Sequence, residues 1–334
     1  MQSSDRPILA VTMGDPSGIG PEIVAKAADD PRVTEQARLL VVGDAATLEA
    51  ATEVTGVPLR VRALASPNEA VYAPGTLEVL DLKNVDLPSL PRGRVNPMAG
   101  AAAFACLRKA TELALSGAVQ GIVTAPLNKE ALNQAGYRYP GHTEALADLT
   151  GTREVAMLLV AGALRVGHVS THVPLCEAIR RVQRRRIVTV ARLTEEAVRR
   201  MGVDRPRLAV AGLNPHAGEG GLFGTEEAAE IAPAVEELAA DGYLVTGPLP
   251  PDSVFLRALR GEFDAVIAMY HDQGHIPTKL IGFDEGVNVT LGLPILRTSA
   301  DHGTAFDIAW TGVARPGSMV AAILLAARMA GGHP

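Results

Sequence analysis

The chain has 334 residues, of which 47% are hydrophobic and 20% are charged. This length and this share of apolar residues suffice for one large core or two medium ones, and they exclude an intrinsically disordered chain. The formal net charge is −6. No broad basic field therefore exists to drive general binding to nucleic acid or to an anionic membrane, and we expect neither as a partner.

The two cysteines, Cys106 and Cys176, are too few for a disulfide framework and form no C-x-x-C pair. The N-terminus lacks the charged and then apolar pattern of a signal peptide, and the apolar runs are too short to span a bilayer. We therefore expect a cytoplasmic protein. The one basic cluster, Arg180–Arg186, has no interleaved aromatic residues, so we interpret it as the solvated start of a helix.

Short apolar runs rich in Val, Ile and Leu alternate with amphipathic stretches, which is typical of a sheet with crossover helices. We expect strands at Pro7–Met13, Leu39–Gly43, Gly121–Ala125, Val155–Val160, Arg165–Ser170, Leu208–Leu213, Ala265–Tyr270 and Val287–Leu291. We expect helices at Pro21–Ala28, Met98–Leu115, Thr143–Thr150, Thr189–Met201, Glu226–Ala240 and Ser318–Met329. Residues Ser66–Pro97, which include five prolines, are the least regular stretch, and we interpret them as an excursion between two lobes.

Polar, glycine-rich loops directly follow several of these apolar runs. In open α/β sheets, ligands bind beyond the carboxyl ends of the strands, so these loops are the first candidates for a functional site. The first of them, Met13–Glu22, has glycines spaced G-x3-G-x-G, which matches neither the dinucleotide fingerprint nor the P-loop. A tight turn leading into a helix and a ligand-binding loop both stay open for it.

Of the eight histidines, five stand in such loops: His142, His172, His216, His271 and His275. A single loop histidine more often faces solvent or forms a hydrogen bond than binds a metal. If the strands before these loops are neighbours in one sheet, however, the imidazoles meet at one rim and can supply three nitrogens to a divalent cation. Three neutral ligands leave the cation its charge and open positions, which a Lewis acid needs.

His271 and His275 also have the i, i+4 spacing of helical zinc proteases. We disfavour that interpretation, because the acid in the motif is Asp272 rather than glutamate, a glycine lies inside the motif and Pro277 follows it. The apolar run before the motif also resembles a strand, which favours a loop here.

Lys279 and Arg297 are the basic residues nearest the histidine loops. A bound phosphate or carboxylate would use arginine as a bidentate fork and lysine as a point charge. Solvation at the surface is the alternative for each of them.

Six motifs follow one another along the chain: MGDPSGIGPE from Met13, YPGHTE from Tyr139, THVPL from Thr171, LNPHAGE from Leu213, YHDQG from Tyr270 and GVNVTLGLPILRTSADHGTA from Gly286. Together they resemble the 4-hydroxythreonine-4-phosphate dehydrogenase family of pyridoxal phosphate biosynthesis. The resemblance runs from Ile8 to Leu325, which is nearly the whole chain.

This resemblance implies a two-lobed α/β/α fold similar to the isocitrate and isopropylmalate dehydrogenases, with a cleft between the lobes. We place the first lobe at residues 1–125 plus 300–334, and the second, with most metal and substrate residues, at residues 126–299. The family also implies a homodimer whose active site is shared between the subunits.

The resemblance places the metal ligands at His172, His216 and His271. It places the substrate-binding residues at His142, Thr143, Lys279, Asn288 and Arg297. Residues His302–Ala309 are similar to a cofactor loop, so the expected cofactor-binding residues are His302, Gly303, Thr304, Ala305 and Asp307. Lys279 and Asp272 are the expected catalytic residues. Asp301 is expected to hydrogen-bond a site residue without contacting the ligand itself.

The implied reaction oxidises the 3-hydroxyl of a small 4-phosphorylated four-carbon hydroxy acid with NAD or NADP, and the resulting 3-keto acid then loses carbon dioxide. The implied divalent metal is zinc, cobalt, magnesium or nickel. Two features, His275 in place of an aliphatic residue and the stretch Ala305–Gly312, are closer to the catabolic branch that oxidises D-threonate or D-erythronate 4-phosphate. The catabolic and biosynthetic substrates both stay open.

Other functions compete with this one. A third branch of the family oxidises aromatic cis-dihydrodiol dicarboxylates. A metallohydrolase or phosphatase would use the same three histidines to activate water and would need no redox cofactor. A sugar-phosphate binding protein would bind the same ligand without turnover.

Overall fold

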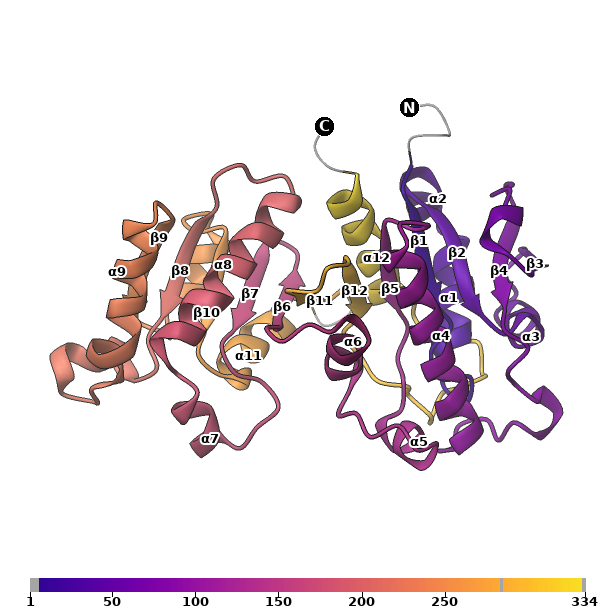
Figure 1. Ribbon diagram of the computed structural model, residues 1–334, viewed down its shortest axis with the longest axis horizontal. Coiled ribbons are helices and arrows are strands. Elements are labelled where there is room, and N and C mark those ends of the chain that lie inside the picture. The colour runs from indigo at the N-terminus through magenta and orange to yellow at the C-terminus, as the bar shows by residue number, and fades with distance from the viewer. Residues whose placement is uncertain (1–5, 283–284, 332–334) are drawn as a thin grey trace. The chain divides into compact units, whose positions relative to one another are not determined.

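The structure, a computed structural model, describes residues 6–282 and 285–331, which form two compact units (Figure 1). The first unit is built from residues 6–153 and 293–331, and the second from the described part of residues 154–292. Residues 126–153 and 293–299, which the sequence analysis places in the second lobe, thus pack within the first unit. The α/β class is confirmed. None of the described helices is long and apolar enough to cross a membrane.

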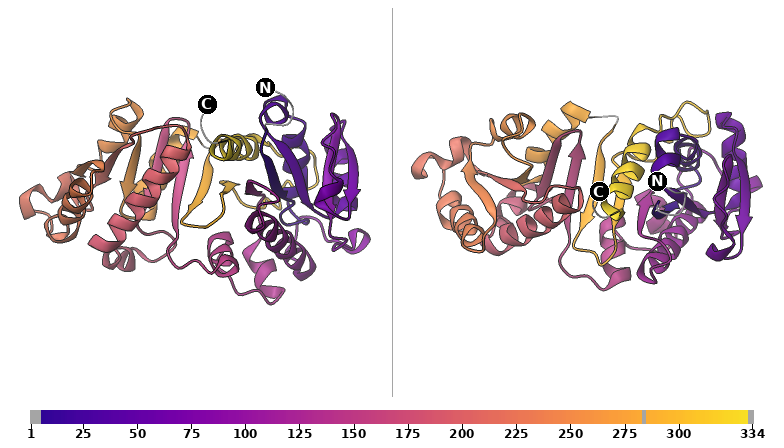
Figure 2. Two further views of the ribbon diagram at one scale, coloured as in Figure 1. Left: turned by 45° about the horizontal axis from the view of Figure 1, so that its top comes forward. Right: turned by 90° about the horizontal axis from the view of Figure 1, so that it is seen from above.

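The first unit holds a fully parallel sheet in the order β3-β4-β2-β1-β5-β12. Its strands are β1 (Ile8–Thr12), β2 (Arg38–Gly43), β3 (Arg60–Leu64), β4 (Thr76–Asp81), β5 (Gly121–Thr124) and β12 (Arg297–Ala300). Its helices are α1 (Gly20–Ala28), α2 (Pro31–Gln36), α3 (Ala45–Thr55), α4 (Pro97–Leu115), α5 (Lys129–Gln134), α6 (His142–Thr150) and α12 (Gly317–Ala330). The central strands are buried on both faces, because α4 covers one face and α12, against which α1 packs, covers the other (Figure 2).

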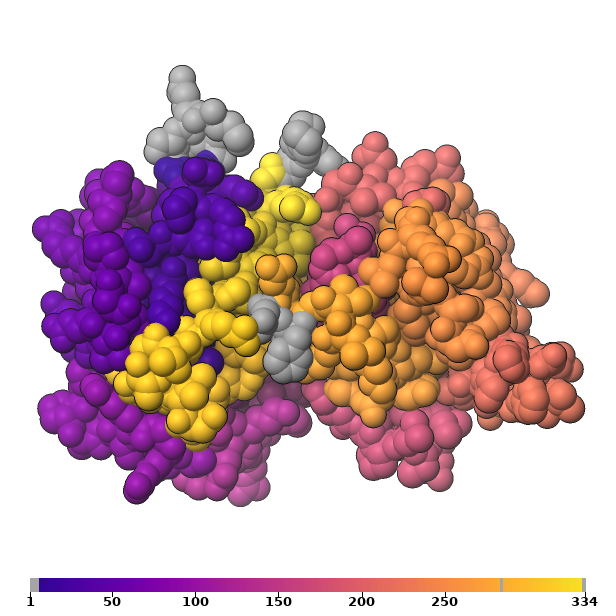
Figure 3. Space-filling model, turned by 180° about the vertical axis from the view of Figure 1, so that it is seen from behind, coloured from indigo at the N-terminus to yellow at the C-terminus, as the bar shows by residue number. Residues whose placement is uncertain are grey.

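Residues 66–97 do not leave this unit, contrary to the interpretation as an excursion. They contain β4, which pairs in parallel with β2 and with β3. Prolines flank β4 rather than interrupt it, which is why the stretch reads as irregular. The C-terminal segment, yellow in Figure 3, packs against the N-terminal part of the same unit, where α12 contacts α1 and α2.

The second unit holds a mixed sheet in the order β11-β6-β7-β10-β8-β9. Its strands are β6 (Ala156–Ala161), β7 (Leu164–His168), β8 (Arg207–Ala211), β9 (Leu244–Leu249), β10 (Ala265–Ala268) and β11 (Val287–Leu291). β6 is antiparallel to both of its neighbours, whereas β7, β10, β8 and β9 are parallel. Its helices are α7 (Leu175–Arg180), α8 (Arg184–Arg200), α9 (Ala232–Ala240), α10 (Val254–Leu259) and α11 (His271–Gly282).

Side-chain alternation along β7 assigns the helices of this unit to faces. A Cβ on Gly167 would lie 2.3 Å from Thr194 of α8, whereas the neighbouring Val166 and His168 meet Gly274 of α11. Successive residues of a strand point to opposite faces, so α8 and α11 cover opposite faces of the sheet.

The basic cluster spans the end of α7 and the start of α8, so only Arg184–Arg186 lie at a helix start as the sequence analysis expects. Arg184 pairs with Glu237 at 2.7 Å, and Arg185 pairs with Glu154 at 3.4 Å, with all four side chains partly exposed. These pairs fit a helix surface for Arg184 and Arg185. Arg186 is instead partly buried and donates to the backbone oxygens of Val169 at 3.1 Å and Val155 at 2.8 Å.

Candidate functional site

Three neighbouring parallel strands of the second unit carry the three expected metal ligands. β10 lies between β7 and β8, and all three run in the same direction. His172 follows β7, His271 follows β10, and His216 follows β8. The condition set by the sequence, that these strands be neighbours in one sheet, is therefore met, and their loops leave the same edge of it.

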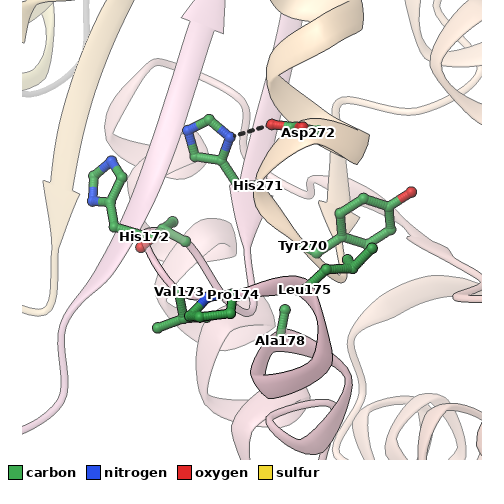
Figure 4. Close-up of a pocket in the computed structure, with 9 residues that line it drawn as sticks. His172, Val173, Pro174, Leu175, Ala178, Tyr270, His271 and Asp272 are labelled. Carbon is green, nitrogen blue, oxygen red and sulfur yellow. Dashed lines mark hydrogen bonds and ion pairs between the residues drawn. The ribbon is translucent and has the colours of Figure 1, made fainter.

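His172 and His271 lie next to each other at this edge. Their ring centroids are 5.5 Å apart, with the rings tilted by 48°. Both line a pocket of about 510 Å³ together with Tyr270, Asp272 and apolar residues of the segment from Val173 to Ala178 (Figure 4). Two imidazoles beside a mostly apolar wall offer nitrogen ligands to a divalent cation.

Asp272 orients the ring of His271. Its Oδ1 lies 2.6 Å from Nδ1 of His271, which Figure 4 marks with a dashed line. A carboxylate accepts the hydrogen bond, so Nδ1 carries the proton and the lone pair lies on Nε2. A carboxylate on one imidazole nitrogen with a free lone pair on the other is the arrangement that metal-binding histidines use, so these residues fit a divalent cation.

His216 is presented by a strained turn. His216, Ala217 and Glu219 have φ angles of 53°, 55° and 41°, in the left-handed region that favours glycine. The nearest aromatic neighbour of its ring is Phe223, at a centroid distance of 6.3 Å. Within residues 6–282 and 285–331, no three potential ligands lie close enough to hold a metal ion. The single chain thus brings together His172 and His271 but does not add His216 to them.

The motif of His271 and His275 is helical, which corrects the expectation of a loop. α11 begins at His271 and continues through Gly274 and Pro277. Gly274 is required there, because a Cβ would lie 2.3 Å from Nε2 of His168. The two rings stack with their centroids 3.5 Å apart instead of converging on one point, so the zinc-protease interpretation remains disfavoured.

A second group of expected residues meets in the first unit. Arg297 is only 2% exposed and donates a hydrogen bond to Oγ1 of Thr124 at 2.7 Å. Burial lowers its pKa to about 9. Burial and the positive charges of Arg297 and Lys129 hold the pKa of His142 well below 6.5. A buried guanidinium beside a lysine and a helix N-terminus favours an anionic ligand.

Lys129 belongs to this group, but the sequence analysis does not propose it as a site residue. It opens α5 just after β5, and the polar loop Thr124–Lys129 was its only signal in the sequence. Thr143 follows His142 in the first turn of α6, half-buried.

The remaining substrate residues lie in the other unit. Lys279 is exposed in the last turn of α11, and Asn288 lies on β11 with its side-chain oxygen buried and without a hydrogen bond from any described residue. Lys279 and Arg297, which the sequence analysis proposes for one anion, belong to different units.

The expected cofactor loop is fixed to the first unit. Oε2 and Oε1 of Glu22, on α1, accept the backbone N–H groups of Trp310 at 2.6 Å and Gly312 at 2.7 Å. The backbone oxygen of Thr304 accepts the N–H of Ile19 at 3.0 Å. Thr304 is buried, Ala305 is half-buried, and His302, Gly303 and Asp307 are exposed. Asp301 donates its backbone N–H to Oγ of Ser318 at 2.9 Å.

The glycine-rich loop Met13–Glu22 is buried throughout and serves this packing. A Cβ on Gly14 would lie 2.5 Å from the oxygen of Pro126, and a Cβ on Gly18 would lie 2.7 Å from that of Thr304. The glycines let backbone segments approach one another, which favours the tight-turn alternative over a ligand loop.

The chain is similar to known proteins over nearly its whole length. Residues 35–326 match the family described as pyridoxal phosphate biosynthetic protein PdxA. A D-threonate 4-phosphate dehydrogenase of Pectobacterium atrosepticum is 51% identical over 324 residues, covering 97% of this chain and 99% of that protein. A 4-hydroxythreonine-4-phosphate dehydrogenase of Desulforapulum autotrophicum is 46% identical, covering 98% and 97%. The crystal structure of a 4-hydroxythreonine-4-phosphate dehydrogenase from Klebsiella pneumoniae has a TM-score of 0.89 and 51% identity, covering 97% and 99%.

Proposed function

Because this chain belongs to the family of the pyridoxal phosphate biosynthetic protein PdxA, we propose that it is a metal- and nicotinamide-dependent dehydrogenase of a 4-phosphorylated four-carbon hydroxy acid. The relatives that span the full chain are dehydrogenases by name. The observation that carries the proposal for this chain is the pair His172 and His271, with Asp272 on the second ring, at the carboxyl edge of three parallel strands.

In this proposal, His172 and His271 hold a divalent cation and His216 completes the ligand set. A bound cation supplies positive charge that makes a substrate hydroxyl easier to deprotonate, and NAD or NADP accepts the hydride. A ligand set of imidazoles favours zinc, cobalt or nickel over magnesium, which prefers oxygen ligands. Asp272 keeps the ring of His271 in the tautomer that leaves Nε2 able to bind.

The anionic groups of the substrate need fixed cations. We assign one anion to the group of Arg297, His142 and Lys129, because three side chains that can donate hydrogen bonds meet there, with the carboxylate of Glu144 acting on Arg297 as well. Thr143 in the first unit, and Lys279 and Asn288 in the second, are the other proposed substrate-binding residues. Lys279 is the proposed catalytic proton carrier. Oxidation at the 3-hydroxyl gives a 3-keto acid, from which carbon dioxide can leave because its carboxylate is beta to the new carbonyl.

The first candidate substrate is D-threonate 4-phosphate. The relative that shares 51% of its residues with this chain is named for that substrate, whereas the relative named for 4-hydroxythreonine 4-phosphate shares 46%. The second candidate is 4-hydroxythreonine 4-phosphate, for which the crystallised protein from Klebsiella pneumoniae is named.

A homodimer is part of the proposal. On α11, the helix that begins with His271, Leu280 is 83% exposed and Ile276 is 57% exposed. Leu222 and Phe223, in the segment that carries His216, are 72% and 45% exposed. Large apolar side chains exposed next to site residues are typical of surfaces that another protein covers. We propose that a second copy of this chain covers this surface and contributes the His216 that completes the ligand set.

The test measures nicotinamide reduction with D-threonate 4-phosphate and with 4-phosphohydroxythreonine, before and after chelation of metal. Release of inorganic phosphate is measured in the same reactions. The proposal expects reduction of the nicotinamide that stops on chelation and returns with added zinc or cobalt. Phosphate release without nicotinamide reduction would instead establish the metallohydrolase alternative.

A further inference from the structure

A second pair of histidines lies behind His271. His275, one turn later on α11, is 7% exposed, and His168, at the end of β7, is 1% exposed. Neither is among the residues that line the pocket of His172 and His271. A buried imidazole is costly without a role, and the proposed chemistry uses neither of these two.

The ring of His275 is held on three sides. Its Nδ1 lies 3.0 Å from the backbone oxygen of His271, and a carbonyl only accepts, so Nδ1 carries the proton. The ring of His168 packs against it at a centroid distance of 4.7 Å and a tilt of 58°. The ring of His271 stacks on it at 3.5 Å and 14°.

We propose that His275 is a positioning residue for His271, because its flat ring forms a wall that leaves the imidazole of His271 one orientation. This inference rests on the proposed function, in which His271 is a metal ligand. At 3.5 Å the two rings are in van der Waals contact, so His271 cannot turn toward the interior. Asp272 fixes the position of Nδ1, and the wall fixes the plane of the ring.

His168 backs this wall. It belongs to a central strand of the sheet, and the absence of a side chain at Gly274 lets α11 come close enough for His275 to reach it. A chain of contacts therefore leads from the buried sheet through His168 and His275 to His271. His275 acts on the site through His271 and has no contact of its own with the pocket.

Two substitutions separate the wall from the nitrogen atoms. His275→Phe keeps a flat ring and loses Nδ1, whereas His275→Leu keeps much of the volume and loses the flat face. Leu238→Ala serves as the control for destabilisation, because Leu238 is fully buried on α9 of the same unit. Thermal melts of all three variants show whether they fold.

The first readout uses the metal-free protein. Histidine labelled with ¹⁵N reports the tautomer of His271, and the wild type is expected to show one set of signals with the proton on Nδ1. His275→Phe should keep these signals, and His275→Leu should show a second set of shifts for the same tautomer, because the plane of the ring is then no longer fixed. Unchanged signals in His275→Leu would overturn the proposal. This readout tests the role of His275 even if the wild type binds no cation. Absence of cation binding would contradict the metal site of the proposed function, not the role of His275.

The second readout is titration with Co²⁺ followed by its visible spectrum. His275→Leu should bind Co²⁺ about 10- to 100-fold more weakly and with an altered spectrum, the usual effect of losing a residue that orients a ligand. His275→Phe should stay within about threefold of the wild type, as should Leu238→Ala. Equal affinity in His275→Leu and wild type would contradict the proposal. So would a loss in His275→Phe as large as that in His172→Ala, because His275 would then be a ligand.

Discussion

Glu227 and Asn214 are joined at two points, because Oε1 of Glu227 accepts the backbone N–H of Asn214 at 2.7 Å and Oε2 accepts its side-chain amide at 2.9 Å. Oε1 also accepts the N–H of Leu213 at 2.8 Å, and Glu227 is only 5% exposed. Two residues after Asn214 comes His216, the first of the left-handed residues. One buried carboxylate thus holds the base of the strained turn that presents His216.

Glu227→Ala is expected to lower the free energy of unfolding by about 2–4 kcal/mol, because it leaves partly buried N–H donors without an acceptor. The affinity for metal should fall as well, since the turn can then relax. Urea denaturation followed by circular dichroism measures the first effect. Glu236→Ala, at an exposed position of α9, should stay within about 0.5 kcal/mol of the wild type. Equal decreases in the free energy of unfolding in the two variants would show that Glu227 does not stabilise the turn of His216.

Asp15 predicts a pH dependence of stability. Its side chain is fully buried, and burial raises its pKa from 3.8 to about 6 although it accepts the N–H of Ser17 at 2.8 Å. Between these two pKa values the folded chain binds more protons than the unfolded chain. Stability from this group is therefore full below about pH 4 and is lost as the pH rises through about 6.

Asp15→Asn should remove this dependence. A pKa raised by about 2 corresponds to about 3 kcal/mol. The free energy of unfolding of the variant minus that of the wild type should therefore increase by about 2–3 kcal/mol from about pH 4 to about pH 7. Urea denaturation of both proteins at the two pH values measures this gain. A constant difference between the two proteins would mean that Asp15 keeps its ordinary pKa.

Gly18→Ala tests the expected cofactor loop. The new Cβ would lie 2.7 Å from the backbone oxygen of Thr304 and 2.8 Å from its Cβ, so the segment from His302 to Asp307 must shift. We expect about tenfold weaker binding of NAD or NADP in calorimetric titrations, which is about 1.4 kcal/mol. Co²⁺ uptake by the second unit should not change. Unaltered nicotinamide affinity in a folded variant would remove this segment from the cofactor site.

Leu280→Glu tests the proposed dimer. Leu280 is 83% exposed, and a charge buried in an apolar interface is strongly unfavourable, so the variant should sediment as a monomer and lose turnover. Leu256→Glu, on α10, changes a side chain that is 50% exposed and should leave the sedimentation unchanged. A wild type that is itself monomeric and active would contradict this part of the proposal.

Hydrophobic periodicity predicts the elements that bury one continuous apolar surface. The bounds of β1, β8 and α12 follow those of the apolar runs within two residues, because each of these elements contributes its own apolar side chains to the core. β12 was missed because its four residues, RTSA, include no large apolar side chain. Its buried side chains include those of Arg297 and Thr298, which are polar, so the alternation of apolar and polar residues that marks a strand is absent from its sequence.

α11 was missed for the opposite reason, since Gly274 and Pro277 both oppose a helix locally. The close packing of Gly274 on His168 and Val166 overrides that preference, and such a contact is visible only in the fold. For the site, the loops of His172 and His271 could be predicted from their place after apolar runs. The stacking of His275 on His271 could not, because it depends on the helix.

The central claim is that imidazoles from three chain segments hold one divalent cation. The most direct test is the amount of zinc or cobalt bound per chain, measured by elemental analysis after dialysis, in the wild type and in His172→Ala, His216→Ala and His271→Ala, alongside nicotinamide reduction. We predict one cation per chain in the wild type, and loss of both the cation and turnover in each variant. Full turnover in a wild type stripped of metal, or a cation retained by all three variants, would contradict the account.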